Sequence, residues 1–378
     1  MLGEFLAFST FKRDGIELPA SFTATVNGEM KVGGVEETLT VTGEAPQVDV
    51  QTTSQQVQLG RTFLEATPTA RVIQSMEVYV PGVQQPAGFA SGLQNTTAQR
   101  ALSIHGGRGT EHNAAVDGFP IRNMGGPGGT SDYYNTNDGT VAELVVSTAS
   151  GGAEYQMGAL VVNIIPKEGG NVVTGQVYFH YADQNMQANN ISAALAQTIV
   201  VGGTGGAGAI RKSIDFNPGL GGPIVKDKLW FFGSFRTTDS NVDAGIAYNA
   251  TPTAWIYTPD TSRPKANQIL RDQSYSLRLT YQASLRNKFS VLVEDQPKFW
   301  YKSSAEIAFR LGDAGQSHVA SFVFGYNRSI SATTAPEAST WSPYYPQYLT
   351  QATWKSPVSN KFLVEAGTAF QNADLKLY

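Results

Sequence analysis

The chain has no cysteine among its 378 residues. Disulfides, thiolate metal sites and cysteine nucleophiles are therefore excluded within this sequence, although the absence fixes no compartment. Charged residues are scarce, at 15 % against the roughly 25 % of soluble domains. Lysine and arginine number 27 against 31 acidic residues, so the basic excess that binds nucleic-acid phosphates is missing. We expect no nucleic-acid partner.

Long hydrophobic runs are also missing. The longest candidate, Gly158 to Ile165, has the length of a strand and falls far short of the roughly 18 apolar residues that a membrane-spanning helix needs. Any membrane span must therefore be made of strands. The 39 glycines and 11 % aromatic residues favour strands and turns over helices, which makes a mainly β fold the expectation.

What the sequence does have, after residue 170, is alternation of apolar and polar side chains with period two, the mark of a strand with two different faces. The clearest case is Tyr275 to Gln282, where Tyr275, Leu277, Leu279 and Tyr281 point one way and Ser276, Arg278, Thr280 and Gln282 point the other. The same pattern recurs at 176–181, 229–236, 289–294, 348–355 and 362–371. About seven strands can be counted between Val172 and Gln371.

The connections between these strands are unequal in length. Those at 225–228, 285–287 and 356–360 are tight, whereas 237–271 and 297–343 are long. Transmembrane β-barrels have this asymmetry, with short periplasmic turns and long extracellular loops. The pattern therefore favours an antiparallel transmembrane barrel. The alternative is a soluble β-sandwich, for example a carbohydrate-binding one, which would bury the apolar face against a second sheet.

Residues 59–170 show no such alternation and instead have short apolar runs between glycine-rich loops such as Gly125-Gly-Pro-Gly-Gly. This predicts a loop-rich α+β globular domain. A helix is expected over Phe63 to Glu77, with Thr62 as its cap, Glu65 at the spacing of a capping box, and an interruption at Pro68.

Several short motifs follow one another in a fixed order. They are Pro81-Gly-Val, Ile104-His-Gly-Gly-Arg, Val116-Asp-Gly-Phe-Pro-Ile, Val161-Val-Asn-Ile-Ile-Pro-Lys and the string from Gly221 to Arg236. Together they resemble TonB-dependent outer-membrane receptors, and Phe11 to Gly34 resembles the end of the carboxypeptidase-regulatory-like β-sandwich that precedes the plug in one subgroup. The resemblance implies a sandwich tail over 1–35, a TonB box and linker over 36–58, a plug over 59–170 and the N-terminal part of the barrel over 171–378.

The resemblance also implies partners. Glu37, Thr38, Leu39, Thr40, Val41, Thr42 and Gly43 resemble a TonB box, which would engage a TonB-like periplasmic energy transducer. Alternating Thr, Leu and Val can add as a strand to an exposed sheet edge and transmit a pull. The same seven residues also suit the last strand of the preceding sandwich domain, and both interpretations stay open here.

A receptor of this kind would lie in the outer membrane of a Gram-negative cell, with its plug facing the periplasm and its strands in contact with lipid. It would be no enzyme, need no cofactor, and import an extracellular ligand; a surface or adhesion protein without transport is the alternative. Candidate ligand contacts are Arg122, Asn123, Tyr133 and Tyr134, and candidate structural residues of the plug are Arg108, Asp117 and Gly118. Arg108 either pairs with a carboxylate of the barrel lumen or is solvated.

Other chemistry finds no support. The run from Val201 to Gly208 lacks the Lys-Ser/Thr of a nucleotide loop, and the spacing of His105, His112 and Asp117 fits no common metal site. Seven strands also cannot close the 22-stranded barrel that the resemblance implies. Because unpaired strand edges are not tolerated in lipid, we expect the sequence to be a fragment, a truncated reading frame or a degenerate copy.

Overall fold

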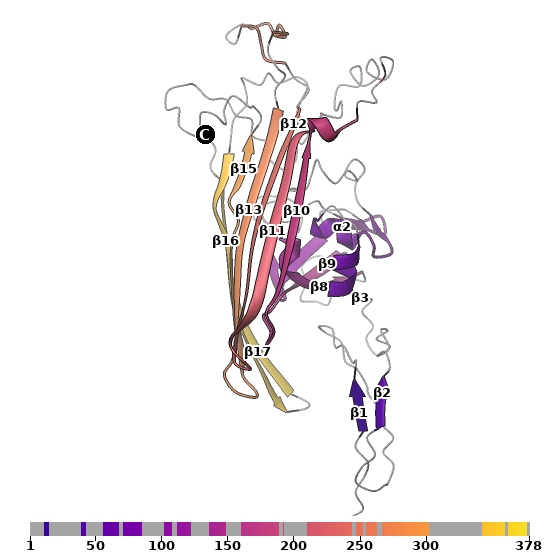
Figure 1. The fold of residues 1–378 in the computed structure, drawn as a ribbon, viewed down its shortest axis with the longest axis vertical. Helices are drawn as coiled ribbons and strands as arrows, with labels where there is room; N and C mark the ends of the chain where they lie inside the picture. Colours follow the sequence, from indigo (N-terminus) through magenta and orange to yellow (C-terminus); the bar gives the residue numbers. More distant parts are fainter. Residues whose placement is uncertain are drawn as a thin grey trace, which may run out of the picture.

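The computed structural model shows a tall β-sheet with a smaller globular unit against one of its faces (Figure 1). The structure describes residues 11–14, 39–42, 56–67, 71–84, 102–107, 112–121, 136–148, 160–188, 192, 210–243, 247–251, 255–262, 267–301, 342–359 and 362–375.

The tall sheet is an antiparallel meander. Its strands are β10 (Thr174–Asp183), β11 (Ile210–Val225), β12 (Leu229–Asp243), β13 (Asn267–Gln282), β14 (Lys288–Asp295), β15 (Lys298–Tyr301), β16 (Ser342–Ser359) and β17 (Phe362–Leu375). Tight turns join β11 to β12 and β13 to β14 at the lower end (Figure 1), whereas the longer stretches 244–266 and 302–341 separate β12 from β13 and β15 from β16. This asymmetry agrees with the predicted distribution of connections.

The strands are longer than their alternation predicted. β12 continues to Asp243 and β13 begins at Asn267, so the connection between them covers 244–266 rather than 237–271. A strand of 16 residues such as β13 spans about 50 Å, whereas the apolar band of a transmembrane barrel is roughly 25 Å tall. Backbone pairing therefore extends beyond the part of each strand that carries the two-faced pattern.

The eight strands occupy seven positions in the described sheet, because β14 and β15 lie end to end. Both pair with β13 in one continuous register, from Gln282 opposite Lys288 to Ile269 opposite Tyr301. Only Gln296 and Pro297 separate them. Proline has no N–H to donate to the ladder, which accounts for the interruption.

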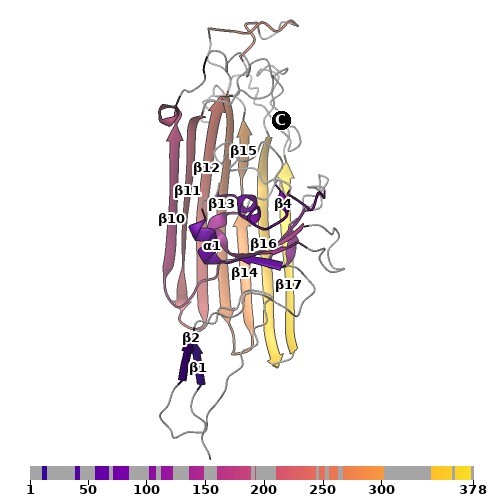
Figure 2. The same cartoon turned by 90° about the vertical axis from the view of Figure 1, so that its right-hand side faces the viewer.

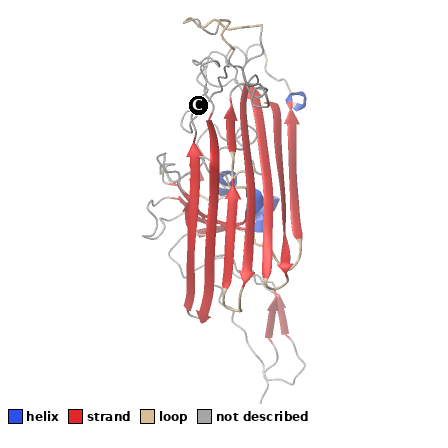
Figure 3. Ribbon diagram, turned by 90° about the vertical axis from the view of Figure 1, so that its left-hand side faces the viewer, coloured by secondary structure: helices blue, strands red, loops and turns tan. Residues whose placement is uncertain are grey.

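The polarity of this sheet is inverted relative to a soluble protein. The outward apolar residues of β13 are 46 % (Tyr275), 46 % (Leu277), 38 % (Leu279) and 40 % (Tyr281) exposed. The polar residues between them are buried, with exposed fractions of only 8 % (Ser276), 5 % (Arg278) and 1 % (Thr280). Figure 3 shows the outward face with no further layer in front of its strands. A β-sandwich would bury the apolar face, so the sandwich alternative is wrong, and the arrangement is that of the wall of a transmembrane β-barrel.

The globular unit contains a second, mixed sheet with the strand order β3-β8-β9-β6-β7. Its strands are β3 (Gln56–Leu59), β6 (His112–Val116), β7 (Phe119–Ile121), β8 (Val141–Ser147) and β9 (Leu160–Pro166). β9 is central, with β8 antiparallel on one side and β6 parallel on the other. Its run of Leu, Val and Ile suits a strand that is buried on both faces. Leu102, Leu144, Val146, Leu160 and Val162 are almost fully buried and form the centre of the core.

The expected helix over Phe63 to Glu77 is wrong in its extent. The structure has two short helices, α1 (Arg61–Ala66) and α2 (Ile73–Glu77), so the helical segment begins two residues earlier than expected. An interruption was expected at Pro68, which itself lies outside the described residues. The expected capping box is also wrong, because Gly60 is the N-cap and no side chain caps the helix. Glu65 instead forms an ion pair with Arg61 at 2.7 Å, one turn earlier.

The remaining elements are short. They are β1 (Phe11–Asp14), β2 (Leu39–Thr42), β4 (Val83–Gln84), β5 (Ser103–Ile104) and the 3₁₀ turns η2 (Asp138–Thr140) and η3 (Gln184–Met186). β1 and β2 pair in parallel, apart from both larger sheets (Figure 1). Among the described residues, no helix has the length and apolar character to cross a bilayer.

Candidate functional site

The candidate site is the interface between the globular unit and the inward face of the tall sheet. In Figure 2 the smaller sheet lies across the strands of the larger one. The inward face is polar: Asp215, Asn217, Arg236, Ser276 and Arg278 are all at least 92 % buried there. Buried polar groups need partners, so the hydrogen bonds and ion pairs of this interface determine how the unit is held.

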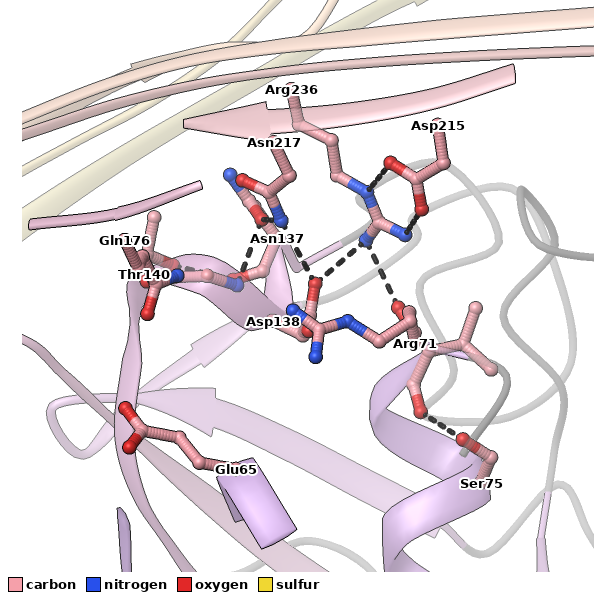
Figure 4. A network of polar contacts seen from close by, with 12 residues as sticks. Glu65, Arg71, Ser75, Asn137, Asp138, Thr140, Gln176, Asp215, Asn217 and Arg236 are labelled. Carbon is pink, nitrogen blue, oxygen red and sulfur yellow. Dashed lines mark hydrogen bonds and ion pairs between the residues drawn. The ribbon is translucent and has the colours of Figure 1, made fainter. Parts of the chain in front are cut away.

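Arg236 on β12 is the centre of the first polar network (Figure 4). Its Nε and Nη2 donate to the two carboxylate oxygens of Asp215 at 3.1 and 2.7 Å, a bidentate pair within the sheet. Its Nη1 lies 3.2 Å from Asp138 of the globular unit. The same nitrogen donates to the carbonyl of Arg71 at 3.0 Å. One buried guanidinium thus joins the wall to two separate segments of the unit.

Asn217 on β11 extends this network to the 3₁₀ turn η2. Its Nδ2 donates to Asn137 Oδ1 at 2.7 Å and to Asp138 Oδ1 at 3.0 Å. A Cβ at Gly139 would lie 2.7 Å from Asn217 Oδ1, so only glycine permits this approach. Gln176 on β10 donates to the carbonyl of Gly139 at 3.1 Å. The turn η2 is therefore bound to both β10 and β11.

Arg278 on β13 is the centre of the second network. It pairs with Asp117 at 2.5 Å and with Glu168 at 2.9 Å, and Lys288 on β14 pairs with Glu168 at 2.5 Å. Asp117 has a φ of +48° and Gly118 a φ of +82°, so the β6–β7 turn presents the carboxylate to the wall. Asp and Gly tolerate positive φ best, which explains their place in this turn.

The segment that joins the unit to β10 is fixed along its length. Lys167 Nζ donates to Gln176 at 2.7 Å. A side chain at Gly169 would overlap the backbone of Phe231. Asn171 Oδ1 accepts from the backbone N–H of Asp227 and from Trp230 Nε1, both at 2.8 Å. The C-terminal end of the unit is therefore anchored on the wall.

The acid sensitivity of this anchor follows from Glu168. Burial alone would raise the pKa of Glu168, but the adjacent Arg278 and Lys288 outweigh it and lower that pKa below its usual value. A lowered carboxyl pKa stabilises the folded state above the unfolded pKa of about 4.3, and this contribution is lost as the pH falls through the lower folded value.

We therefore expect Glu168→Gln to flatten the acid side of the stability curve, with its largest effect above pH 4. The measurement is the unfolding midpoint of the complete protein in detergent between pH 3 and pH 7. Glu365→Gln is the matched control, because Glu365 and its partner Lys355 are more than half exposed. Equal pH curves for the wild type and Glu168→Gln would contradict the assignment.

Few of the residues singled out in the sequence fall in these networks. Asp117 and Gly118 do. Arg108, Arg122, Asn123, Tyr133 and Tyr134 lie outside the described residues, as do 303–336. Of the seven box residues, Leu39–Thr42 form β2, and Glu37, Thr38 and Gly43 lie outside the described ranges. Among described residues, no group of three or more His, Asp or Glu is placed to hold a metal ion.

The central residues of the interface were missed as a site. Arg236 and Arg278 appeared only as polar members of alternating strands, and Asp138, Asp215 and Glu168 were not singled out. Charge on the polar face of a strand whose other face is apolar was the available signal. The partners of Arg278 are Asp117 and Glu168, which lie 161 and 110 residues away along the chain, so no local pattern pairs them with it.

No family model matches the chain. It is 26 % identical over 242 residues to the TonB-dependent transporter Oar of Myxococcus xanthus, a match that covers 60 % of this chain and 21 % of that protein. Among solved structures, the outer-membrane transporter YddB of Escherichia coli superposes with a TM-score of 0.55 at 12 % identity. The siderophore receptor PirA of Acinetobacter baumannii does so with a TM-score of 0.51 at 15 % identity.

These two structural matches cover 84 % and 83 % of this chain, and 39 % of the YddB and PirA chains. The chain thus spans about a fifth of its curated relative and about two fifths of its structural relatives, in agreement with the expectation of an incomplete barrel. That residues 1–35 end a carboxypeptidase-regulatory-like domain stays a prediction. The chain is thus similar in sequence to a TonB-dependent transporter and has the plug-and-barrel fold of outer-membrane receptors.

Proposed function

We propose that the chain forms the plug and the first barrel strands of a TonB-dependent receptor, which imports an extracellular ligand by energy-coupled rearrangement of the plug. The observation that carries the proposal is the polar character of the plug-to-wall interface. Among the residues that the structure describes, 18 buried residues form the apolar core cluster, and of these only Leu292 and Leu349 belong to the barrel sheet. The remaining attachment described above consists of hydrogen bonds and ion pairs.

A polar interface suits a plug that moves. Separating apolar surfaces exposes them to water at a cost of about 25 cal/mol per Å², with no compensation. Hydrogen bonds and ion pairs can instead be exchanged for bonds to water when a channel fills, and each contributes only about 0.5–1.5 kcal/mol net, or about 1.5–3 kcal/mol where a charged group takes part. The apolar core inside the plug keeps the unit intact, while its polar surface allows it to be displaced.

The proposed partner is a TonB-like periplasmic energy transducer that binds residues 37–43. Support comes from β1 and β2, which pair over only four residues and lie apart from the other sheets. A two-stranded sheet of this size is marginal in water. β2 is therefore available to exchange its partner for the sheet edge of another protein. Arg122, Asn123, Tyr133 and Tyr134 remain the proposed ligand contacts, with the ligand itself open.

Deleting Glu37 to Gly43 from the complete receptor is expected to abolish energy-coupled uptake while leaving ligand binding at the cell surface intact. A finer test keeps the length of the chain: Leu39→Pro removes a backbone N–H that strand addition needs, whereas Leu39→Val keeps it. The measurement is accumulation of labelled ligand by whole cells. Uptake that persists after the deletion would favour the alternative, an outer-membrane surface or adhesion protein without transport.

A further inference from the structure

The segment that follows the proposed box lies at one edge of the plug sheet. β3 is an edge strand of four residues, and within the described part of the chain it pairs with β8 alone. α1 follows directly and packs on β8. Its Glu65, whose side chain is 49 % exposed, approaches Lys167 at 3.7 Å. A pull on the chain before Gln56 would separate the β3–β8 pairs one at a time, starting from the end of the strand.

The next fixed point along the chain is Arg71. Its Nε forms an ion pair with Asp138 at 2.8 Å. Its carbonyl accepts from Arg236 at 3.0 Å, and its guanidinium lies over the ring of Tyr178, 4.3 Å from the centroid. Figure 4 shows Arg71 between η2 and the barrel strands. Both its backbone and its side chain are therefore held, by β12, η2 and β10 together.

The backbone conformation of Arg71 agrees with this assignment. Its φ is +60°, a region that non-glycine residues seldom adopt. Such a conformation persists only where the surroundings impose it, and the three contacts of Arg71 supply that constraint.

Beyond Arg71 the plug is tied more firmly. His112 Nε2 lies 3.3 Å from Glu77 Oε2, and both side chains are at least 98 % buried, so α2 and β6 are packed closely together. β6 is joined in turn to the wall, because Gln351 donates to the carbonyl of Val116 at 3.1 Å. The Arg278 network and the anchored linker complete this attachment.

We propose that Arg71, with Tyr178, Asp138 and Arg236, forms a clamp that divides the plug into two mechanical parts. The leading segment, residues 56–70, follows a pull on the N-terminal side; the part from Arg71 onward stays on the wall until the clamp opens. The clamp resists because its contacts act on one residue and must break together, whereas the β3 pairs break in succession. This inference rests on the proposed function, which supplies the pull.

The test is to pull the complete receptor, held in a lipid bilayer, by a handle attached before Gln56. A first event at low force is expected to release about 15 residues, or roughly 50 Å of extended chain. A second event at higher force follows when the clamp opens. In Arg71→Gln the force of the second event is expected to fall, while the attachment beyond residue 71 keeps it above the force of the first event. Arg61→Gln is the matched control, since Arg61 is an exposed arginine of the leading segment, and it should leave the second event unchanged.

Tyr178→Leu provides a second variant that leaves the plug sequence intact and should also lower the force of the second event. The inference is overturned if the first event releases chain well beyond residue 71, or if Arg71→Gln and Tyr178→Leu both leave the second event unchanged. The force pattern needs neither ligand nor energy transducer. The clamp can therefore be confirmed even if deletion of residues 37–43 spares uptake, and it can be refuted even if that deletion abolishes uptake. The two proposals can thus fail independently of each other.

Discussion

Replacing Arg236 by methionine is expected to weaken the attachment of the plug to the barrel wall by about 3–5 kcal/mol. Arg236 is 8 % exposed, and its guanidinium pairs with both Asp215 and Asp138, of which Asp138 also pairs with Arg71. Methionine keeps much of the aliphatic length of the side chain but leaves two buried carboxylates with one cation fewer. The measurement is hydrogen exchange of the β8 and β9 amides in the complete receptor in lipid, from which the free energy of plug opening is obtained.

Two controls separate lost charge from lost shape. Arg271→Met removes an ion pair with Asp239 on the same sheet, but Arg271 has 46 % of its side chain exposed, so a change below about 1 kcal/mol is expected. Adding Asp215→Asn to Arg236→Met should recover much of the loss, because Asp138 keeps Arg71 as its partner and no buried carboxylate is then left without a cation. If Arg236→Met is as mild as Arg271→Met, the Arg236 network does not hold the plug.

Replacing Leu277 by arginine is expected to destabilise the barrel in a bilayer by about 2–4 kcal/mol. Leu277 is 46 % exposed on the outward face of β13, opposite Gly233 on one neighbour and Val293 on the other. Tyr275 and Tyr281 lie on the same face on either side, as interfacial aromatic residues do around an apolar band. An arginine at this depth must lose hydration or distort the bilayer around it.

The matched control is Leu285→Arg in the tight turn between β13 and β14. Leu285 is fully exposed, at 100 %, yet lies beyond the strand ends, so the expected change is about 0–1 kcal/mol. The measurement is reversible folding of the complete protein into lipid vesicles against urea. Equal effects at the two leucines would contradict the lipid-facing assignment, since in water both substitutions of exposed leucines should be nearly neutral.

Much of the barrel sheet could be predicted because its signal is local. Alternation at Tyr275 to Gln282 specifies a strand with two faces without reference to any other part of the chain. The ends of the strands could not be predicted, since backbone pairing in β12 continues past the two-faced segment to Asp243. The helix boundaries failed for a related reason: the capping-box spacing of Thr62 and Glu65 is a weak local preference, and Glu65 pairs with Arg61 instead.

The site itself was largely beyond the sequence. Asp117 was singled out because it lies in a motif, yet its partner Arg278 is 161 residues away. Arg71 gave no sign of its role, which depends on Tyr178, Asp138 and Arg236 from three other elements. Pairing of this kind is set by the way two sheets pack, and one sequence does not encode it in any local pattern.

The sequence by itself determined that any membrane span is made of strands, that these strands have an apolar and a polar face, and that a loop-rich unit precedes them. It left open which face is buried, because alternation is the same in a sandwich and in a barrel wall. Only the tertiary structure decided this, by placing the plug against the polar face and leaving the apolar face outward. The physical reason is that burial of a sheet face depends on what packs against it, and here the plug supplies the charges that the buried arginines of the wall require.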